Sequence, residues 1–322
     1  MKHYKRVWYN TTSKPYPFVS RETLKYKIVL WLILAIFKHF LLILCTFRGI
    51  IFVQRNCKKG KRTVHIISFA NQKGGVGKTT SAVNCAAALG ALGKKVLLID
   101  LDPQGSSTSS VGVAKNSVKY SSYDVITKNC EASKAIIATE YKNLSVMPSN
   151  MALAAAELEL ATEEKREYFL KGALEELEKT SDFDYAIIDC PPSLGIITIN
   201  ALAASKGLIV PIQCEYFALE GLSQLMMTFK SVRQRYNPRL NITGILITMY
   251  NARYKLSAQV LEELNKYYSY QLFDTKISRT ISLSEAPSFG EPIRYYSRYS
   301  KGSLEYDDVA KEIVTRIEGY LS

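Results

Sequence analysis

The sequence predicts a doubly wound α/β fold over residues 64–322, in which a mostly parallel sheet is covered by helices on both faces. Strand-like and helix-like segments alternate along this stretch at the spacing expected for strand–helix–strand units. Several strand-like segments, such as residues 95–101, are continuous apolar runs, which is typical of parallel strands covered on both faces. A glycine-rich loop between the first strand and the first helix is the third observation.

The individual elements follow in regular order. The first strand is expected at residues 64–70, and the helix over residues 79–92 is apolar on most sides and ends at Gly93. Residues 105–118 are small, polar and loop-like, and residues 151–180 have helical spacing rich in Ala, Glu and Leu. No repeat or linker divides this stretch, so we expect one domain. The other strands are expected at residues 95–101, 144–148, 184–190, 207–212 and 242–249, and the other helices at residues 194–204, 217–236, 256–267 and 303–321.

The net positive charge of the chain comes from its N-terminal part. The 322 residues have a formal net charge of +13. Residues 1–64 contain 14 Lys and Arg and one acid, whereas residues 65–322 contain 28 basic and 28 acidic residues. Nucleic-acid binding by the α/β domain would therefore require a local basic patch.

Residues 1–63 form an atypical basic and apolar extension before this domain. Residues 28–47 are apolar except for Lys38, His39 and Thr46, and basic segments flank them. About 20 apolar residues can span a bilayer, although a central charge costs about 2.5–3.5 kcal/mol. The extension has no small-residue cleavage site, which argues against a signal peptide. Three alternatives stay open: a dispensable or disordered segment, membrane association through residues 28–53, or a folded accessory element.

The cysteine pattern argues against metal and disulfide chemistry. The six cysteines form no C-x-x-C pair, and no histidine lies at zinc-site spacing from them. Buried, reduced thiols of a cytosolic protein fit this pattern best. An iron–sulfur carrier ATPase is disfavoured too, because it would need bridging cysteines.

Residues 71–80, with the sequence Asn-Gln-Lys-Gly-Gly-Val-Gly-Lys-Thr-Thr, have the composition of a phosphate-binding loop. Glycines let the backbone approach phosphates, and the helix N-terminus behind the loop favours negative charge. Lys78 can reach the β- and γ-phosphates, and the Thr79 hydroxyl can bind Mg²⁺. The ordinary motif has glycine where this chain has Gln72, and a second lysine, Lys73, opens the loop. The fold is therefore expected to be of the P-loop NTPase type.

Two further strands end in carboxylates, where doubly wound sheets bind their ligands. Asp100 and Asp102 end one strand and lie on the same strand face. A second apolar strand leads to Asp189, which is the Walker B pattern in which the Asp holds Mg²⁺ through a water. A lone Asp after an apolar strand is usually a helix cap, but a P-loop in the same domain favours the metal role.

Together these motifs resemble those of the ParA/Soj family of chromosome- and plasmid-partitioning ATPases. The resemblance rests on Lys-Gly-Gly-Val-Gly-Lys-Thr-Thr, Leu-Ile-Asp-Leu-Asp-Pro-Gln-Gly and Ile-Ile-Asp-Cys-Pro-Pro-Ser-Leu-Gly, and residues 211–221 and 283–292 agree with it. It covers residues 64–320, with the motifs in the same order.

The resemblance implies a slow, partner-stimulated ATPase that uses ATP and Mg²⁺ and forms a homodimer when ATP is bound. In this deviant Walker A family the extra lysine, here Lys73, crosses the dimer interface to the phosphates of the other subunit. Asp102 matches the residue that positions the attacking water, and Asp100 is expected to support the metal site or the loop. The implied catalytic residues are Lys73, Lys78 and Asp102; the metal ligands are Thr79, Asp102 and Asp189; the nucleotide contacts are Lys73, Gly74, Gly75, Val76, Gly77, Lys78, Thr79, Thr80, Met249 and Asn251.

The resemblance also implies non-specific binding of double-stranded DNA, activation by a ParB-type protein, and a cytoplasmic, nucleoid-associated location. The DNA-contacting arginines of the family match Arg253 and Arg279. Many relatives have a further basic residue where this chain has Ser282, and losing one contact lowers both DNA affinity and its salt dependence. The basic residues that could compensate are Lys255, Arg294 and Arg298.

The main alternative is a MinD-type membrane-cycling ATPase that positions proteins or cell division. Such proteins bind lipid through a basic amphipathic C-terminal helix, whereas residues 307–322 alternate acids with few basic residues. The N-terminal extension could supply an anchor by another route, so this alternative stays open. A sequence-reading DNA-binding arm would need a helix-turn-helix, which residues 1–63 do not resemble.

Overall fold

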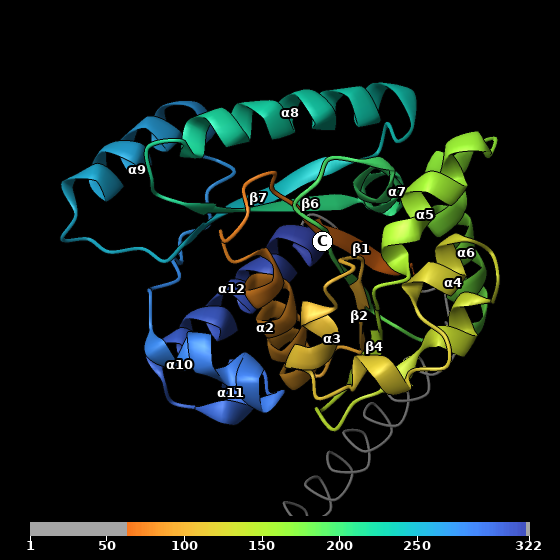
Figure 1. Ribbon diagram of the computed structural model, residues 1–322. Helices are drawn as coiled ribbons and strands as arrows, with labels where there is room; N and C mark the ends of the chain where they lie inside the picture. Colours follow the sequence, from red (N-terminus) through yellow and green to blue (C-terminus); the bar gives the residue numbers. More distant parts are fainter. Residues whose placement is uncertain (1–62, 320–322) are drawn as a thin grey trace, which may run out of the picture. The chain divides into compact units, whose positions relative to one another are not determined.

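The computed structural model describes residues 63–319, so residues 28–53 of the predicted extension lie outside the described residues. The described chain is built on a seven-stranded sheet with the order β3-β4-β2-β5-β1-β6-β7 (Figure 1). Neighbouring strands are parallel except β3, which pairs with β4 in the antiparallel sense. The predicted mostly parallel sheet is therefore confirmed. The strands are β1 His65–Phe69, β2 Val96–Asp100, β3 Ile137–Ala138, β4 Leu144–Met147, β5 Tyr185–Asp189, β6 Gly207–Gln213 and β7 Asn241–Thr248.

Helices cover both faces of this sheet, as predicted. In Figure 1, α8 and α9 lie on one side of the sheet, and α2, α10, α11 and α12 lie on the other. None of the helices within residues 63–319 has the length and apolar character that crossing a bilayer requires. The helices are α2 Lys78–Ala91, α3 Ser106–Ser110, α4 Ser122–Ile126, α5 Leu153–Glu159, α6 Phe169–Thr180, α7 Ile196–Ala204, α8 Ala218–Arg235, α9 Lys255–Tyr268, α10 Ile281–Glu285, α11 Ile293–Tyr296 and α12 Lys301–Glu318.

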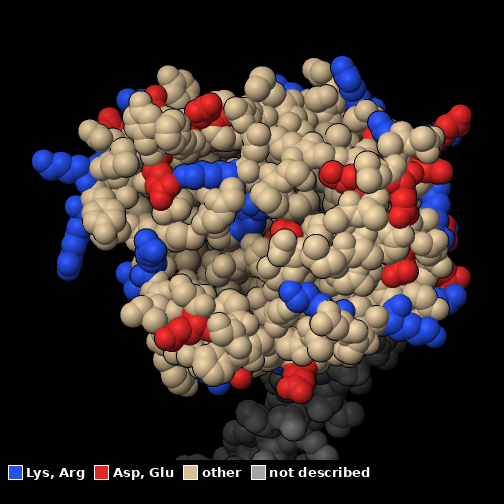
Figure 2. Space-filling view, in the orientation of Figure 1, with Lys and Arg blue, Asp and Glu red and all other residues tan. Residues whose placement is uncertain are grey.

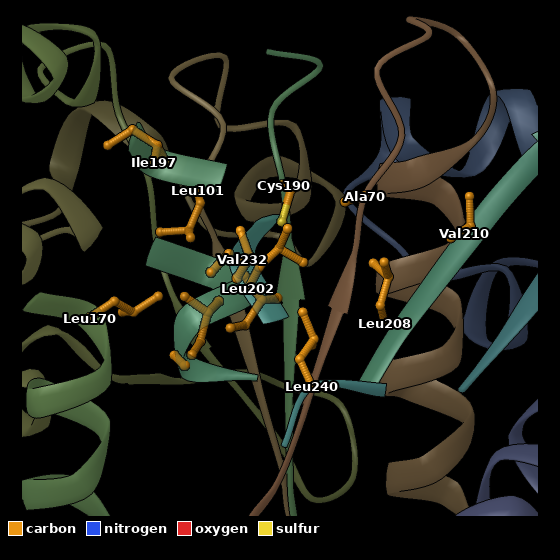
Figure 3. Close-up of a cluster of buried hydrophobic side chains, with 14 of the residues drawn as sticks. Ala70, Leu101, Leu170, Cys190, Ile197, Leu202, Leu208, Val210, Val232 and Leu240 are labelled. Carbon is orange, nitrogen blue, oxygen red and sulfur yellow. The ribbon is translucent and has the colours of Figure 1, made fainter. Parts of the chain in front are cut away.

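The alternation of side chains along each strand divides the core into two layers. On β2, Leu97 and Ile99 belong to one buried cluster, and Val96 and Leu98 belong to the other. Figure 3 shows the first of these clusters, where α6 and α7 contribute buried leucines. Burying one such side chain stabilises the fold by about 1.5–3 kcal/mol. Both faces of the strand are thus covered, as its continuous apolar sequence predicted.

Several stretches differ from their sequence-based expectations, since β3, α4, α10 and α11 form where no element was expected. Within residues 105–118, expected as loop, α3 forms because Gly105 adopts φ 60° and Thr108 bonds to the buried Asp100. Residues 151–180, expected as continuous helix, divide into α5 and α6, with Lys165 in the left-handed region at φ 57° between them. The residues around this break are charged and offer no apolar face. Asn200 of α7 accepts from the Leu170 amide at 3.1 Å and donates to the Arg166 carbonyl at 2.8 Å, so a tertiary contact holds the start of α6.

Candidate functional site

The carboxyl ends of three neighbouring strands bring the P-loop and two acidic residues together. Phe69 at the end of β1 is in register with Asp189 of β5, and Asp189 is in register with Asp100 of β2. Both aspartates are fully buried. The loop that leaves β1 therefore begins beside this carboxylate pair, at the edge of the sheet where doubly wound folds bind ligands.

The P-loop turns into α2 through two left-handed glycines. Gly75 has φ 72° and Gly77 has φ 81°, values that strain a residue with a side chain. Within the described residues, no heavy atom beyond the adjacent residues lies within 4 Å of a Cβ built on Gly74 or Gly75, so the space beside these two glycines is open. The Thr248 hydroxyl at the end of β7 donates to the Val76 carbonyl at 2.8 Å, which anchors the loop from the opposite side.

Lys78 is held inside the P-loop. Its side chain is buried, and its ammonium donates to the carbonyl oxygen of Lys73 at 3.1 Å. Burial lowers the pKa of Lys78, while the nearby Asp189 and Asp102 act in the opposite direction. The structure therefore brings one buried cation and two of the predicted carboxylates into one site.

Asp100 is engaged by the loop that follows β2. Its Oδ2 accepts hydrogen bonds from the Thr108 amide at 2.8 Å and the Thr108 hydroxyl at 2.7 Å, and its Oδ1 accepts from the Asp102 amide at 3.1 Å. Burial raises the pKa of Asp100 to about 6, although the bonds from Thr108 lower it. Asp100 shapes the loop that carries Asp102, which is a supporting role.

Asp189 keeps one oxygen available for a cation or its water. Its Oδ2 accepts from the Ser107 hydroxyl at 2.8 Å, whereas among residues 63–319 no donor reaches the buried Oδ1. Burial and the neighbouring Asp100 raise the pKa of Asp189 to about 7, while Ser107 and Thr79 lower it. A buried carboxylate oxygen without a partner is costly, and a hard cation held beside Thr79 would satisfy it. The residues present therefore fit Mg²⁺.

Asp102 lies at the turn between β2 and α3. It is partly exposed, and its Oδ1 accepts from the Gln104 amide at 2.9 Å. Its charge acts on both Lys78 and Asp189, so it borders the same space as they do. Ser107 was not predicted as a site residue, because nothing in its serine-rich surroundings distinguishes it from a loop residue.

The second lysine, Lys73, forms an ion pair within its own chain. Its Nζ lies 2.5 Å from Oε2 of Glu215, in the connection between β6 and α8, and the two side chains are 32% and 46% exposed. Asn71 holds the backbone at this point, since it accepts from the Lys73 amide at 3.1 Å and donates to the Pro211 carbonyl at 2.7 Å. Glu215 was not predicted as a site residue, although it lies in residues 211–221, which carry part of the resemblance.

The two predicted adenine contacts follow β7. Met249 has φ 51°, and its Cε lies 3.8 Å from a Cβ built on Gly77, so it lies against the P-loop. The Asn251 side chain instead accepts from the Arg253 amide at 3.0 Å, which forms a tight turn. The Asn251 side chain therefore stabilises the turn of the loop that contains Arg253.

The predicted DNA contacts, Arg253 and Arg279, are exposed on neighbouring segments. Tyr250, just after β7, pairs with Ser278 in a parallel bridge, which brings the two segments side by side. Figure 2 shows basic side chains projecting at the edge near α9, on the face that also contains the site. These arginines thus project from two adjacent segments that follow β7 and precede α10.

Of the three basic residues that could replace the contact missing at Ser282, two are exposed and one is held in an ion pair. Lys255 and Arg298 are exposed, and the Arg298 guanidinium lies 5.7 Å from the centre of the Tyr299 ring. Arg294 is engaged in an ion pair with Asp307 of α12.

Comparison with known proteins gives consistent matches over the described domain. A family model described as an AAA domain matches residues 64–242. The sporulation initiation inhibitor protein Soj of Bacillus subtilis is 49% identical over 248 residues, which cover 77% of this chain and 97% of that protein. The chromosome partitioning protein ParA of Caulobacter vibrioides is 42% identical over 253 residues, covering 79% of this chain and 95% of that protein.

A solved structure has the same fold and a nucleotide bound. The crystal structure of cobyrinic acid a,c-diamide synthase from Mycobacterium smegmatis with bound ADP and magnesium has a TM-score of 0.70 and 37% sequence identity to this chain. The match covers 80% of this chain and 97% of that one.

Proposed function

The chain belongs to the ParA/Soj family of chromosome-partitioning ATPases, and we propose that it is an ATP-dependent dimerising switch that binds DNA non-specifically and partitions a chromosome or plasmid. It hydrolyses ATP to ADP and phosphate and uses Mg²⁺ as its cofactor. We assign this activity to residues 64–322, with the N-terminal extension outside the ATPase domain. The observation that carries the proposal is the grouping of Lys78, Asp102 and the buried Asp189 beside an open P-loop.

Each residue of the site would have a distinct task in ATP hydrolysis. The amides along residues 74–80 and the Lys78 ammonium would bind the phosphates, and Met249 would lie against the base. Thr79, Asp102 and Asp189 would hold Mg²⁺, which neutralises phosphate charge and aligns the terminal phosphoryl group when bound. The Asp102 carboxylate would orient the attacking water, since it is the acid of the pair that the loop leaves partly exposed.

Lys73 would couple ATP binding to dimerisation. In the monomer its ammonium is paired with Glu215, and both side chains are about a third to a half exposed. An exposed ion pair of this kind contributes about 0–1 kcal/mol, so its loss is a small cost. A cation brought to the phosphates of the partner subunit stabilises their charge far more effectively, because water is excluded there.

Dimerisation would in turn create the DNA-binding form. Arg253 and Arg279 of each subunit would contact DNA phosphates, and a dimer doubles the number of phosphates neutralised at once. A ParB-type activator would accelerate hydrolysis and return the protein to the monomer. DNA binding of this kind would hold the protein at the nucleoid.

The test measures binding of the full-length protein to a DNA duplex of arbitrary sequence at low salt, with ADP and with a non-hydrolysable ATP analogue. We expect binding only with the ATP analogue, and an ATPase rate that rises when DNA and a ParB-type protein are both added. Absence of DNA binding in both nucleotide states would refute the partitioning switch. Capture of the ATP-bound protein by anionic vesicles instead would favour the membrane-cycling alternative.

A further inference from the structure

The C-terminal helix α12 contacts both the P-loop helix and the segment that carries Arg279. Two consecutive residues make these contacts. The buried Tyr306 reaches Ser81 of α2, with 3.1 Å between the hydroxyl oxygens. The Glu305 carboxylate accepts hydrogen bonds from the Ser278 amide at 2.8 Å and from the Ser278 hydroxyl at 2.7 Å. One turn of α12 therefore joins two regions that our functional proposal treats separately.

The contact with α2 lies close to the nucleotide site. Ser81 is in the first turn of α2, two residues after Thr79, and its amide donates to the Gly77 carbonyl at 2.9 Å. The Ser81 side chain is fully buried, and that of Tyr306 is almost so. Because breaking a buried hydroxyl pair leaves polar groups without partners, a movement of this turn of α2 would carry α12 with it.

The contact with Ser278 fixes the backbone from which Arg279 projects. The Ile277 amide donates to the Ile247 carbonyl at 2.8 Å, and the Tyr250 amide donates to the Ile277 carbonyl at 2.9 Å, so the end of β7 holds one side of this segment. Glu305, whose side chain is only 14% exposed, holds the other side. A carboxylate that accepts two bonds from one residue fixes its orientation as well as its position.

We propose that Glu305 is a positioning residue for DNA binding, and that the α12 turn formed by Glu305 and Tyr306 transmits the nucleotide state from α2 to Arg279. The proposal rests on the proposed function, because it takes Arg279 as a DNA contact. Such a connection requires that the segment of residues 274–280 has two arrangements and that the nucleotide changes their balance. The bonds of Glu305 to Ser278 select one arrangement.

The first experiment does not depend on DNA. Hydrogen exchange is measured at the amides of residues 274–280 in the full-length protein, with ADP and with Mg²⁺ and a non-hydrolysable ATP analogue. We expect slower exchange with the analogue in the wild type, and loss of this difference in Tyr306→Phe, which removes only the hydroxyl. Equal exchange in both nucleotide states of the wild type would overturn the inference, whether or not the protein binds DNA.

The second experiment compares DNA affinity in the two nucleotide states. Glu305→Gln should lower the affinity with the ATP analogue by about fivefold or more, the lower end of typical coupling between sites. It should leave ATPase activity without DNA unchanged, and it should shrink the ratio between the ATP-state and ADP-state affinities. An unchanged ratio would overturn the positioning role. If Arg279→Ala itself has no effect on DNA affinity, Arg279 is not a DNA contact and the positioning role falls with it.

Two matched variants on the same helix serve as controls. Glu312→Gln removes a carboxylate that accepts from the Asp274 and Thr275 amides, each at 2.9 Å, at the far end of the same segment. It should leave the ratio of affinities unchanged, because a purely structural contact affects both states alike. Asp308→Asn makes the same change of charge at an exposed position whose ion pair is with Lys311, and it should have no effect. An effect of Asp308→Asn equal to that of Glu305→Gln would contradict the proposal.

Discussion

Two lysines five residues apart have opposite environments in the P-loop. Lys78 is buried and bonded to a loop carbonyl, whereas the Lys73 side chain is 32% exposed and paired with Glu215. A buried ammonium held within the loop can serve only the nucleotide of its own chain. An exposed lysine at the rim of the site can exchange its partner, which a role across a dimer interface requires.

Substitution of each lysine should therefore separate nucleotide binding from dimerisation. Lys78→Ala should abolish ATP binding, because it removes the cation at the phosphates. Lys73→Ala should still bind ATP but remain monomeric. Equilibrium binding of a fluorescent ATP analogue and sedimentation velocity with Mg²⁺ and ATP measure the two properties. An ATP-dependent dimer of the Lys73 variant would rule out the role in the partner subunit.

The pair of Lys73 and Glu215 should oppose dimerisation slightly. Glu215→Gln keeps the size of the side chain and releases the lysine, so the ATP concentration needed for half-maximal dimerisation should fall, by at most about fivefold for a pair this exposed. Light scattering during an ATP titration measures this. Glu176→Gln, at an exposed acid of α6 that is paired with Lys179, is the matched control and should have no effect. A higher ATP requirement in Glu215→Gln would mean that Glu215 makes a favourable contact in the dimer.

At the scale of elements, the amino end of β1 is fixed by a polar cluster at the edge opposite the site. Glu318 of α12 accepts hydrogen bonds from the Tyr185 hydroxyl at 2.7 Å and from Lys94, and the His65 ring lies against the Tyr185 ring with 5.4 Å between centroids. Burial, and then the charge of Lys206, lowers the pKa of His65 below its usual 6.5. His65 is therefore neutral in the folded protein at neutral pH.

This arrangement predicts a stability that depends on pH. Because the pKa of His65 is lower in the folded than in the unfolded chain, its contribution to stability is complete above the unfolded value of about 6.5. The contribution is lost progressively as the pH falls below 6.5 and through the lower pKa of the folded chain. Thermal melts of the nucleotide-free protein at about pH 7.5 and 5.5 should show a decrease in Tm. The decrease should be smaller in His65→Gln, which carries no titratable group there. An equal decrease in both proteins would assign the effect to other groups.

For the whole molecule, DNA affinity has to come from a local patch. The domain beyond residue 64 has equal numbers of acidic and basic residues. The exposed Arg253 lies in the loop between β7 and α9, and the exposed Arg279 lies in the adjacent segment before α10. A patch with few arginines neutralises few phosphates and releases few counterions. The slope of log affinity against log salt should therefore be modest, and removing one arginine should change it measurably.

The slope of DNA affinity against salt concentration should therefore depend on the number of these arginine–phosphate contacts. Arg279→Ala removes two phosphate contacts from a dimer, so the slope of log affinity against log salt should become shallower by about 1.8. Fluorescence anisotropy of a labelled duplex at several salt concentrations, with the ATP analogue present, measures the slope. Lys179→Ala, in the exposed last turn of α6, is the control and should leave the slope unchanged. A slope unaffected by Arg279→Ala would exclude Arg279 from the interface.

The sequence by itself predicted six of the seven strands, the P-loop and the three carboxylates at the strand ends. These features are local: an apolar run specifies a buried strand, and the spacing of Gly75, Gly77 and Lys78 specifies the loop that follows it. The six parallel strands and the helices on both faces follow from such local patterns, whereas the antiparallel strand β3 was not predicted. The short helix α3 was not predicted either, because Ser107 and Thr108 are ordered by hydrogen bonds to the buried Asp189 and Asp100 on other elements.

Only the tertiary structure decided which distant residues meet. Lys73 and Glu215 are 142 residues apart, Ser107 and Asp189 are 82 apart, and Ser278 and Glu305 are joined across two helices. No pattern in the sequence predicts such pairs. The order of the strands and the packing of α12 bring them within hydrogen-bond distance, and neither follows from local preferences. Residues whose types and spacing suit the chemistry can thus be proposed from the sequence, whereas the residues that position them depend on the completed fold.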